Sequence, residues 1–148
     1  MTGLLERDAR VLLVASRYPN HALPLWNLPG GRQRDGELLG EALRREFREE
    51  TSLEVAVGAL RYVAESYDRT AGVHFLSCCF EVFAAGTPVV PPDDAHAVAT
   101  AWVAREDLAR TLGVAVVREP LLAHLAGDPA RYYGFASSGI TIEFADPA

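Results

Sequence analysis

The stretch LPGGRQRDGELLGEALRREFREETSL, residues Leu28 to Leu53, places two adjacent glycines ahead of a segment dense in glutamate and arginine. Beyond Gly40 the segment has no glycine or proline and is rich in good helix formers, so we expect a helix over residues 38–51. Three of its glutamates fall within the eight residues REFREETS. So many carboxylates on one short helix need a physical explanation, and that explanation decides what the protein does.

A helical wheel at about 100° per residue separates two faces of this helix. The apolar residues share one arc: Leu39, Ala42, Leu43 and Phe47. Glu46 and Glu50 fall in the middle of that arc, and Glu49 falls at its edge. A mixed-charge set that suits water occupies the opposite arc: Glu41, Arg44 and Arg48. The solvated-face interpretation therefore fits Glu41 but not Glu46 or Glu50.

Carboxylates that face inward repel one another and raise each other's pKa values unless a cation or a set of donors compensates. Hard oxygen ligands without a nearby His or Cys favour Mg²⁺ or Mn²⁺ over zinc. Buried pairs of these glutamates with Arg45 and Arg48 are the rival explanation, and the residues alone leave both open. Gly30 and Gly31 favour the ligand-site explanation, since glycine lets a backbone approach a bound group closely.

Length and charge exclude several classes of protein. The 148 residues suit one domain over residues 1–148, long enough for a core of its own. A net charge of -6 argues against a long nucleic acid as partner. No apolar run approaches the roughly 20 residues of a membrane span, and the first residues lack a secretory pattern, so we expect no membrane association and a cytoplasmic location. The chain contains no lysine, which excludes Schiff-base chemistry.

The rest of the chain is typical of strands with a second main helix. We expect a hairpin from residues 3–6 and 10–17, a loop over 16–29, antiparallel strands over 53–67 and 73–84, a strand over 98–104, a short helix over 105–112, a helix over 114–125 and a small terminal hairpin over 131–144. Pro120 either kinks the helix over 114–125 or marks its first turn. Cys78 and Cys79 are adjacent in a strand, so they point to opposite faces and should not pair.

The glycine-to-glutamate stretch closely resembles the signature of the Nudix hydrolases. Gly31, Glu37 and the run Arg45 to Leu53 carry the resemblance, and WNLPGG, residues 26–31, resembles the approach to that signature. A pattern with so many fixed positions is highly specific. Ser52 departs from it, because the family usually has glycine there. A left-handed cap conformation costs a serine roughly 1 kcal/mol, so we expect a modest effect on stability.

The resemblance implies an α/β (α+β) fold of the Nudix type, a three-layer α/β/α sandwich with a mixed β-sheet. It also implies Mg²⁺-dependent hydrolysis of a nucleoside diphosphate linked to another group, with Mn²⁺ as a substitute. Carried over, Glu46, Glu49 and Glu50 would bind the metal with the carbonyl of Gly30. Glu37 and Arg45 would form a supporting ion pair, and one glutamate, Glu46 or Glu49, could orient or deprotonate the attacking water instead of binding metal.

Further ligands and substrate contacts stay open at this level. A further acidic ligand could come from Asp93, Asp94 or Glu81, each of which could equally be an ordinary surface residue. Substrate contacts are proposed for Arg17, Trp26, Gly31 and Arg32, since guanidinium groups match phosphate oxygens and glycine backbone can approach a ligand. Aromatic faces for a base could come from Tyr18, Trp26, Tyr67 and Phe75.

The nucleotide itself is not determined by the sequence. Markers of the family's ADP-ribose and dinucleoside polyphosphate subgroups are missing, because their positions hold Asp68 and Thr70. We therefore favour nucleoside triphosphates, including oxidised ones, over ADP-ribose, nucleotide sugars and dinucleoside polyphosphates. A silent nucleotide-sensing or partner-binding domain is the alternative, and the resemblance makes a homodimer plausible.

Overall fold

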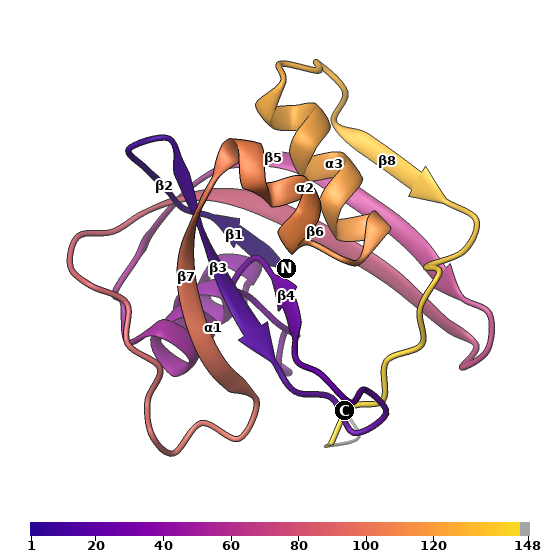
Figure 1. The fold of residues 1–148 in the computed structure, drawn as a ribbon, viewed down its shortest axis with the longest axis horizontal. Helices are drawn as coiled ribbons and strands as arrows, with labels where there is room; N and C mark the ends of the chain where they lie inside the picture. Colours follow the sequence, from indigo (N-terminus) through magenta and orange to yellow (C-terminus); the bar gives the residue numbers. More distant parts are fainter. Residues whose placement is uncertain (146–148) are drawn as a thin grey trace.

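A computed structural model describes residues 1–145. Its elements follow in the order β1 (Thr2–Leu4), β2 (Glu6–Arg7), β3 (Arg10–Ser16), β4 (Leu25–Asn27), α1 (Leu39–Thr51), β5 (Ala56–Asp68), β6 (Val73–Phe83), β7 (Ala97–Ala104), a 3₁₀ turn η1 (Arg105–Asp107), α2 (Leu108–Thr111), α3 (Ala115–Leu125) and β8 (Tyr132–Phe135). The mixed α+β class expected from the sequence is confirmed (Figure 1).

The strands form two four-stranded sheets rather than one. In the first sheet the order is β1-β6-β5-β8, with β5 and β6 antiparallel, as expected, and with β1 and β8 each parallel to its neighbour. In the second sheet β3 pairs with β2, β4 and β7, all antiparallel. Asp8 and Ala9 turn the β2–β3 hairpin with positive φ angles of 50° and 58°, as a tight two-residue turn requires.

Strand β3 is buried on both faces, which gives the fold its layers. Val11 and Leu13 join an apolar cluster with Leu108 of α2, Leu112 directly after α2, and Leu121 of α3. Leu12, which points to the opposite face, joins Leu43 and Phe47 of α1 in a second cluster. Helices therefore cover both sides of the strands, with α1 on one side and α2 and α3 on the other (Figure 1).

Helix α1 has the faces that the wheel predicted. Its buried residues include Ala42, Leu43 and Phe47 together with Glu50. At the N-terminal end the Glu41 carboxylate accepts a hydrogen bond from the Leu38 amide at 2.8 Å. This contact satisfies one of the donors that a helix start leaves unpaired.

The end of the chain differs from the prediction. Residues 131–144 do not form a hairpin: β8 instead pairs with β5, and residues 136–145 continue without further strand pairing. The hairpin prediction was wrong because β5 offers an open strand edge far away in the sequence. Pro120 lies inside α3 rather than in its first turn. Cys78 and Cys79 are both free, and no helix within residues 1–145 is long and apolar enough to cross a membrane.

Candidate active site

The two glycines bring the chain backbone onto the carboxylates of α1. The amide of Gly30 donates a hydrogen bond to Oε2 of Glu50 at 2.9 Å. Gly30 has a φ of +153°, and a Cβ placed on it would lie 2.2 Å from the carbonyl oxygen of Met1. A Cβ on Gly31 would lie 2.5 Å from the carboxylate of Glu46. Only glycine fits at position 30, and a side chain at position 31 would displace the Glu46 carboxylate, so the two glycines let the loop lie directly against the helix.

Arg45 ties the loop to the helix through several carboxylates. Its guanidinium binds Glu37 twice, at 2.7 Å and 2.9 Å, the ion pair that the family resemblance implies. The Nη1 atom also donates to Glu46 at 2.8 Å and to Glu49 at 3.2 Å. The Arg–Glu pairs that rivalled a metal site are thus present around Arg45. Arg48 instead binds Glu54 on the surface.

Charge around the helix is only partly compensated. Burial raises the pKa of Glu50 well above its ordinary value, against the hydrogen bond from Gly30, and the negative charges of Glu46 and Asp94 raise it further. Burial also raises the pKa of Glu46, although Arg45 opposes that shift. The buried carboxylate of Glu50 has one amide donor and no ion pair among residues 1–145. A cation at this site would favour its charged form.

The oxygen donors of α1 are chemically suited to a divalent ion, but their side chains are not close enough together to share one ion in this structure. Glu46, Glu49 and Glu50 supply the hard oxygens that Mg²⁺ and Mn²⁺ prefer. Within residues 1–145 no three His, Cys, Asp or Glu side chains are grouped closely enough to hold a metal. The Nη1 atom of Arg45 occupies the space between Glu46 and Glu49. Side-chain movement of Arg45 would free both carboxylates.

The loop between β6 and β7 brings two more carboxylates to the same place. Asp93 and Asp94 line a groove of about 370 Å³ together with Arg48 and Glu49. One oxygen of Asp94 accepts hydrogen bonds from the amides of His96 and Ala97. Both aspartates therefore stay candidates for a further ligand.

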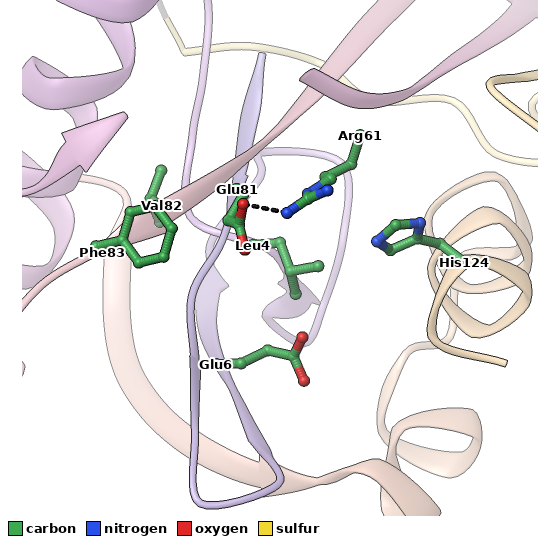
Figure 2. A pocket seen from close by; sticks show the side chains of 7 residues that line it. All are labelled: Leu4, Glu6, Arg61, Glu81, Val82, Phe83 and His124. Carbon is green, nitrogen blue, oxygen red and sulfur yellow. Dashed lines mark hydrogen bonds and ion pairs between the residues drawn. The ribbon is translucent and has the colours of Figure 1, made fainter. Parts of the chain in front are cut away.

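Glu81, the third candidate for a further acidic ligand, lies elsewhere. It pairs with Arg61 and lines a separate pocket of about 120 Å³. Figure 2 shows that Glu6 and His124 face this pocket too. The structure thus separates Glu81 from the carboxylates of α1, since it belongs to a different pocket and is already neutralised by Arg61.

Ser52 adopts the left-handed conformation expected at the end of α1, with φ 59° and ψ 10°. The role of its side chain could not be predicted from the sequence. Its hydroxyl donates to the carbonyl of Val89 at 2.7 Å, and the Val89 amide donates to the carbonyl of Thr51 at 2.8 Å. These two bonds fasten the start of the β6–β7 loop to the helix and offset part of the cost of a left-handed serine.

The substrate candidates divide by position. Arg32 directly follows the glycines, and its carbonyl accepts a hydrogen bond from Arg45 at 3.0 Å. Arg17 is exposed just after β3 and is held through its amide by the carbonyl of His96 at 2.9 Å. Trp26 packs against the apolar cluster on the α3 side of the fold. A packing role accounts for Trp26 without any ligand.

The aromatic candidates also differ in their surroundings. The ring of Tyr67 stacks on His74 with 4.6 Å between centroids, so one of its faces is covered. Phe75 is half-buried opposite Ser66. Burial raises the pKa of the Tyr18 hydroxyl, and the charges of Glu50 and Glu46 raise it further. Of these aromatic rings, Tyr18 therefore lies within electrostatic reach of the glutamates of α1.

Protonation of Glu37 should weaken the fold at low pH. The hydrogen bonds from Arg45 and from the Arg34 amide lower the pKa of Glu37 from 4.5 to about 2. Its pair with Arg45 therefore contributes stability above pH 4.5 that is lost as the pH falls towards 2. Unfolding by urea, measured across this range, should show a steeper loss for the wild type than for Glu37→Gln. Glu106→Gln, on an exposed residue of η1, is the control and should behave like the wild type.

A sequence model of the NUDIX domain matches residues 2–125, so the chain belongs to the Nudix family. Solved structures agree. The solution structure of the ORF135 protein of Escherichia coli is 27% identical, with a TM-score of 0.70 over 87% of this chain and 91% of that one. The crystal structure of a MutT NUDIX hydrolase from Burkholderia pseudomallei is 29% identical in sequence, with a TM-score of 0.70 over 84% of this chain and 94% of that one.

Curated relatives carry several activities in their names. An ADP-ribose pyrophosphatase of Methanocaldococcus jannaschii is 37% identical over 93 residues, which are 63% of this chain and 54% of that protein. A CTP pyrophosphohydrolase of Escherichia coli is 33% identical over 72 residues, 49% and 52% of the two chains. The chain spans about half the length of these relatives. The names of these relatives agree on a pyrophosphatase chemistry but not on one nucleotide.

Proposed function

We propose that this chain is a Nudix pyrophosphohydrolase that uses Mg²⁺, or Mn²⁺ in its place, to cleave the diphosphate linkage of a small nucleotide. The observation that carries the proposal is the buried carboxylate of Glu50, held by the Gly30 amide beside Glu46 and Glu49. Burying a charge without an ion pair destabilises a protein, and a bound metal would supply the missing partner. Residues 1–148 would form one Nudix domain.

Glu46, Glu49 and Glu50 would hold the metal with the carbonyl of Gly30. A divalent ion there supplies two things when bound: neutralisation of the diphosphate charge and a lower pKa for the attacking water. Metal is then part of substrate binding, because bare carboxylates repel a diphosphate.

The chain's own residues orient this site. Arg45, fixed by Glu37, connects α1 to the glycine loop through the carbonyl of Arg32, and its Nη1 atom would leave Glu46 and Glu49 when a metal binds there. One of Glu46 and Glu49 would accept the proton of the attacking water instead of holding the metal.

For the substrate we favour nucleoside triphosphates, including oxidised ones. The position of the ADP-ribose marker holds Asp68, which here binds the amides of Thr70 and Ala71 in the β5–β6 turn and the hydroxyl of Thr141. A structural role at that position supports a substrate other than ADP-ribose, although one relative is named for that activity. The cytoplasmic location and the homodimer stay predictions.

A substrate panel tests the proposal. Release of phosphate and pyrophosphate is measured from CTP, dGTP, 8-oxo-dGTP, ADP-ribose, a nucleotide sugar and a dinucleoside polyphosphate, each with Mg²⁺, with Mn²⁺ and with a chelator. Turnover that requires metal is expected, strongest on a triphosphate. Folded protein that binds a nucleotide but releases no product would support the nucleotide-sensing alternative instead.

A further inference from the structure

The C-terminal segment, residues 136–145, crosses from the first sheet towards the loop that follows β3. At its start the amide of Ser138 donates to the carbonyl of Tyr67 at 2.7 Å. Further along, the hydroxyl of Thr141 donates to Asp68 at 3.0 Å. The segment is therefore fixed to the end of β5, and its direction follows from these contacts (Figure 1).

The same segment is fixed at its far side to the loop after β3. The side-chain nitrogen of Asn20 donates a hydrogen bond to the carbonyl of Thr141 at 2.7 Å. The side-chain oxygen of Asn20 accepts one from the amide of Glu143 at 3.0 Å. The ring of His21 also contacts the Thr141 carbonyl at 2.8 Å. Hydrogen bonds to the end of β5 and to the loop after β3 fix the position of residues 141–143, and residue 144 follows directly.

Phe144 thereby reaches the candidate active site. Its ring lies under the guanidinium of Arg32, with 4.2 Å from Cζ to the ring centroid. It also meets Tyr18 edge to face at 6.2 Å. Arg32 is the residue directly after the two glycines, and Tyr18 is influenced by the charges of Glu50 and Glu46. Even so, 36% of the surface of Phe144 is exposed.

We propose that Phe144, supported by Tyr18 and Arg32, provides the aromatic surface on which the base of the substrate stacks, so that the C-terminal segment favours nucleotides over polyphosphates that have no base. This inference rests on the proposed function. The match to the NUDIX sequence model ends at residue 125, so the family pattern does not include this residue. An aromatic ring near the metal site suits a base, since every nucleobase has a π-face and base–aromatic stacking tolerates changes in sequence.

Substrate affinity should depend on the ring at position 144. Phe144→Ala should raise KM for CTP, dGTP and 8-oxo-dGTP by roughly 10-fold to 100-fold, the size of one lost base–aromatic stack, while kcat stays within about threefold. Phe144→Tyr should restore KM. Inhibition by tripolyphosphate, which has no base, should be the same in all three proteins. Ile140→Ala, in the same segment, is the matched control and should leave KM unchanged.

Two results would overturn the inference. One is an unchanged KM in Phe144→Ala, and the other is an equal loss for nucleotides and tripolyphosphate, which would indicate that Phe144 only holds the fold together. Nucleotide binding to Phe144→Trp, followed by fluorescence with Mg²⁺ present, gives a readout without turnover. Quenching by CTP or dGTP but not by tripolyphosphate would support the stack even if the proposed hydrolysis failed. No quenching by any nucleotide would count against it.

Discussion

Glu50→Gln is expected to abolish turnover and at the same time to stabilise the metal-free protein. Glutamine keeps the shape and can still accept the Gly30 amide, but it removes a buried charge that has no ion pair among the described residues. Loss of a metal-binding carboxylate should lower kcat/KM by roughly 100-fold or more. Removal of the charge should add about 1 kcal/mol of stability, which raises Tm by about 2–4 °C in a chain of this size.

The pH dependence of this gain has a defined sign. The pKa of Glu50 is raised in the folded state, so ionising it costs the folded protein stability as the pH rises above 4.5. The stability difference between Glu50→Gln and the wild type should therefore be small near pH 4 and larger at pH 7. It is measured by thermal unfolding in chelator.

A second variant on the same helix separates charge burial from metal binding. The side chain of Glu49 is 42% exposed, so Glu49→Gln should lower activity without a comparable gain in metal-free Tm. Added Mg²⁺ should raise the Tm of the wild type and fail to raise that of Glu50→Gln. Equal metal-free Tm values for the wild type and Glu50→Gln would show that the buried carboxylate carries no cost, and the charge argument would be wrong.

Local periodicity was enough to predict α1 and the direction of its glutamates. Leu43 and Phe47 are buried, Glu50 is buried among them, and Glu49 lies at the rim, because a helix of 3.6 residues per turn fixes these directions whatever surrounds it. The close approach of Gly30 and Gly31 to a ligand site was predicted from the conformational freedom of glycine. The sequence could not predict which of three carboxylates Arg45 contacts, because that choice depends on side-chain geometry.

Long-range contacts account for what the sequence missed. The hydroxyl of Ser52 binds the carbonyl of Val89, 37 residues away, and Asn20 binds Thr141 across 121 residues. No periodicity encodes such pairs, and each needs a loop placed by other elements. Glu81 shows the reverse case: it was a reasonable ligand by residue type, yet the register of β6 directs it to Arg61.

Gly30→Ala is expected to have the largest effect on stability of any single methyl addition near the site. The new Cβ would lie 2.2 Å from the Met1 carbonyl oxygen and 2.7 Å from Cα of Thr2, and the backbone would keep a φ of +153°. Both neighbours are backbone atoms that cannot rotate away. Strain and displacement together should cost about 3 kcal/mol or more, which lowers Tm by about 6–12 °C.

Activity of Gly30→Ala should fall as well, because the displaced loop can no longer hold Glu50 through its amide. A misplacement of about 1 Å near the reacting groups costs roughly 100-fold in rate. Gly36→Ala is the matched control: Gly36 also has a positive φ, +83°, but a Cβ there meets no atom within 4 Å. It should lose only about 1 kcal/mol to backbone strain and keep its activity. If the two variants unfold at the same temperature, contact with Met1 and Thr2 is not what requires glycine at position 30, and the left-handed φ alone would account for it.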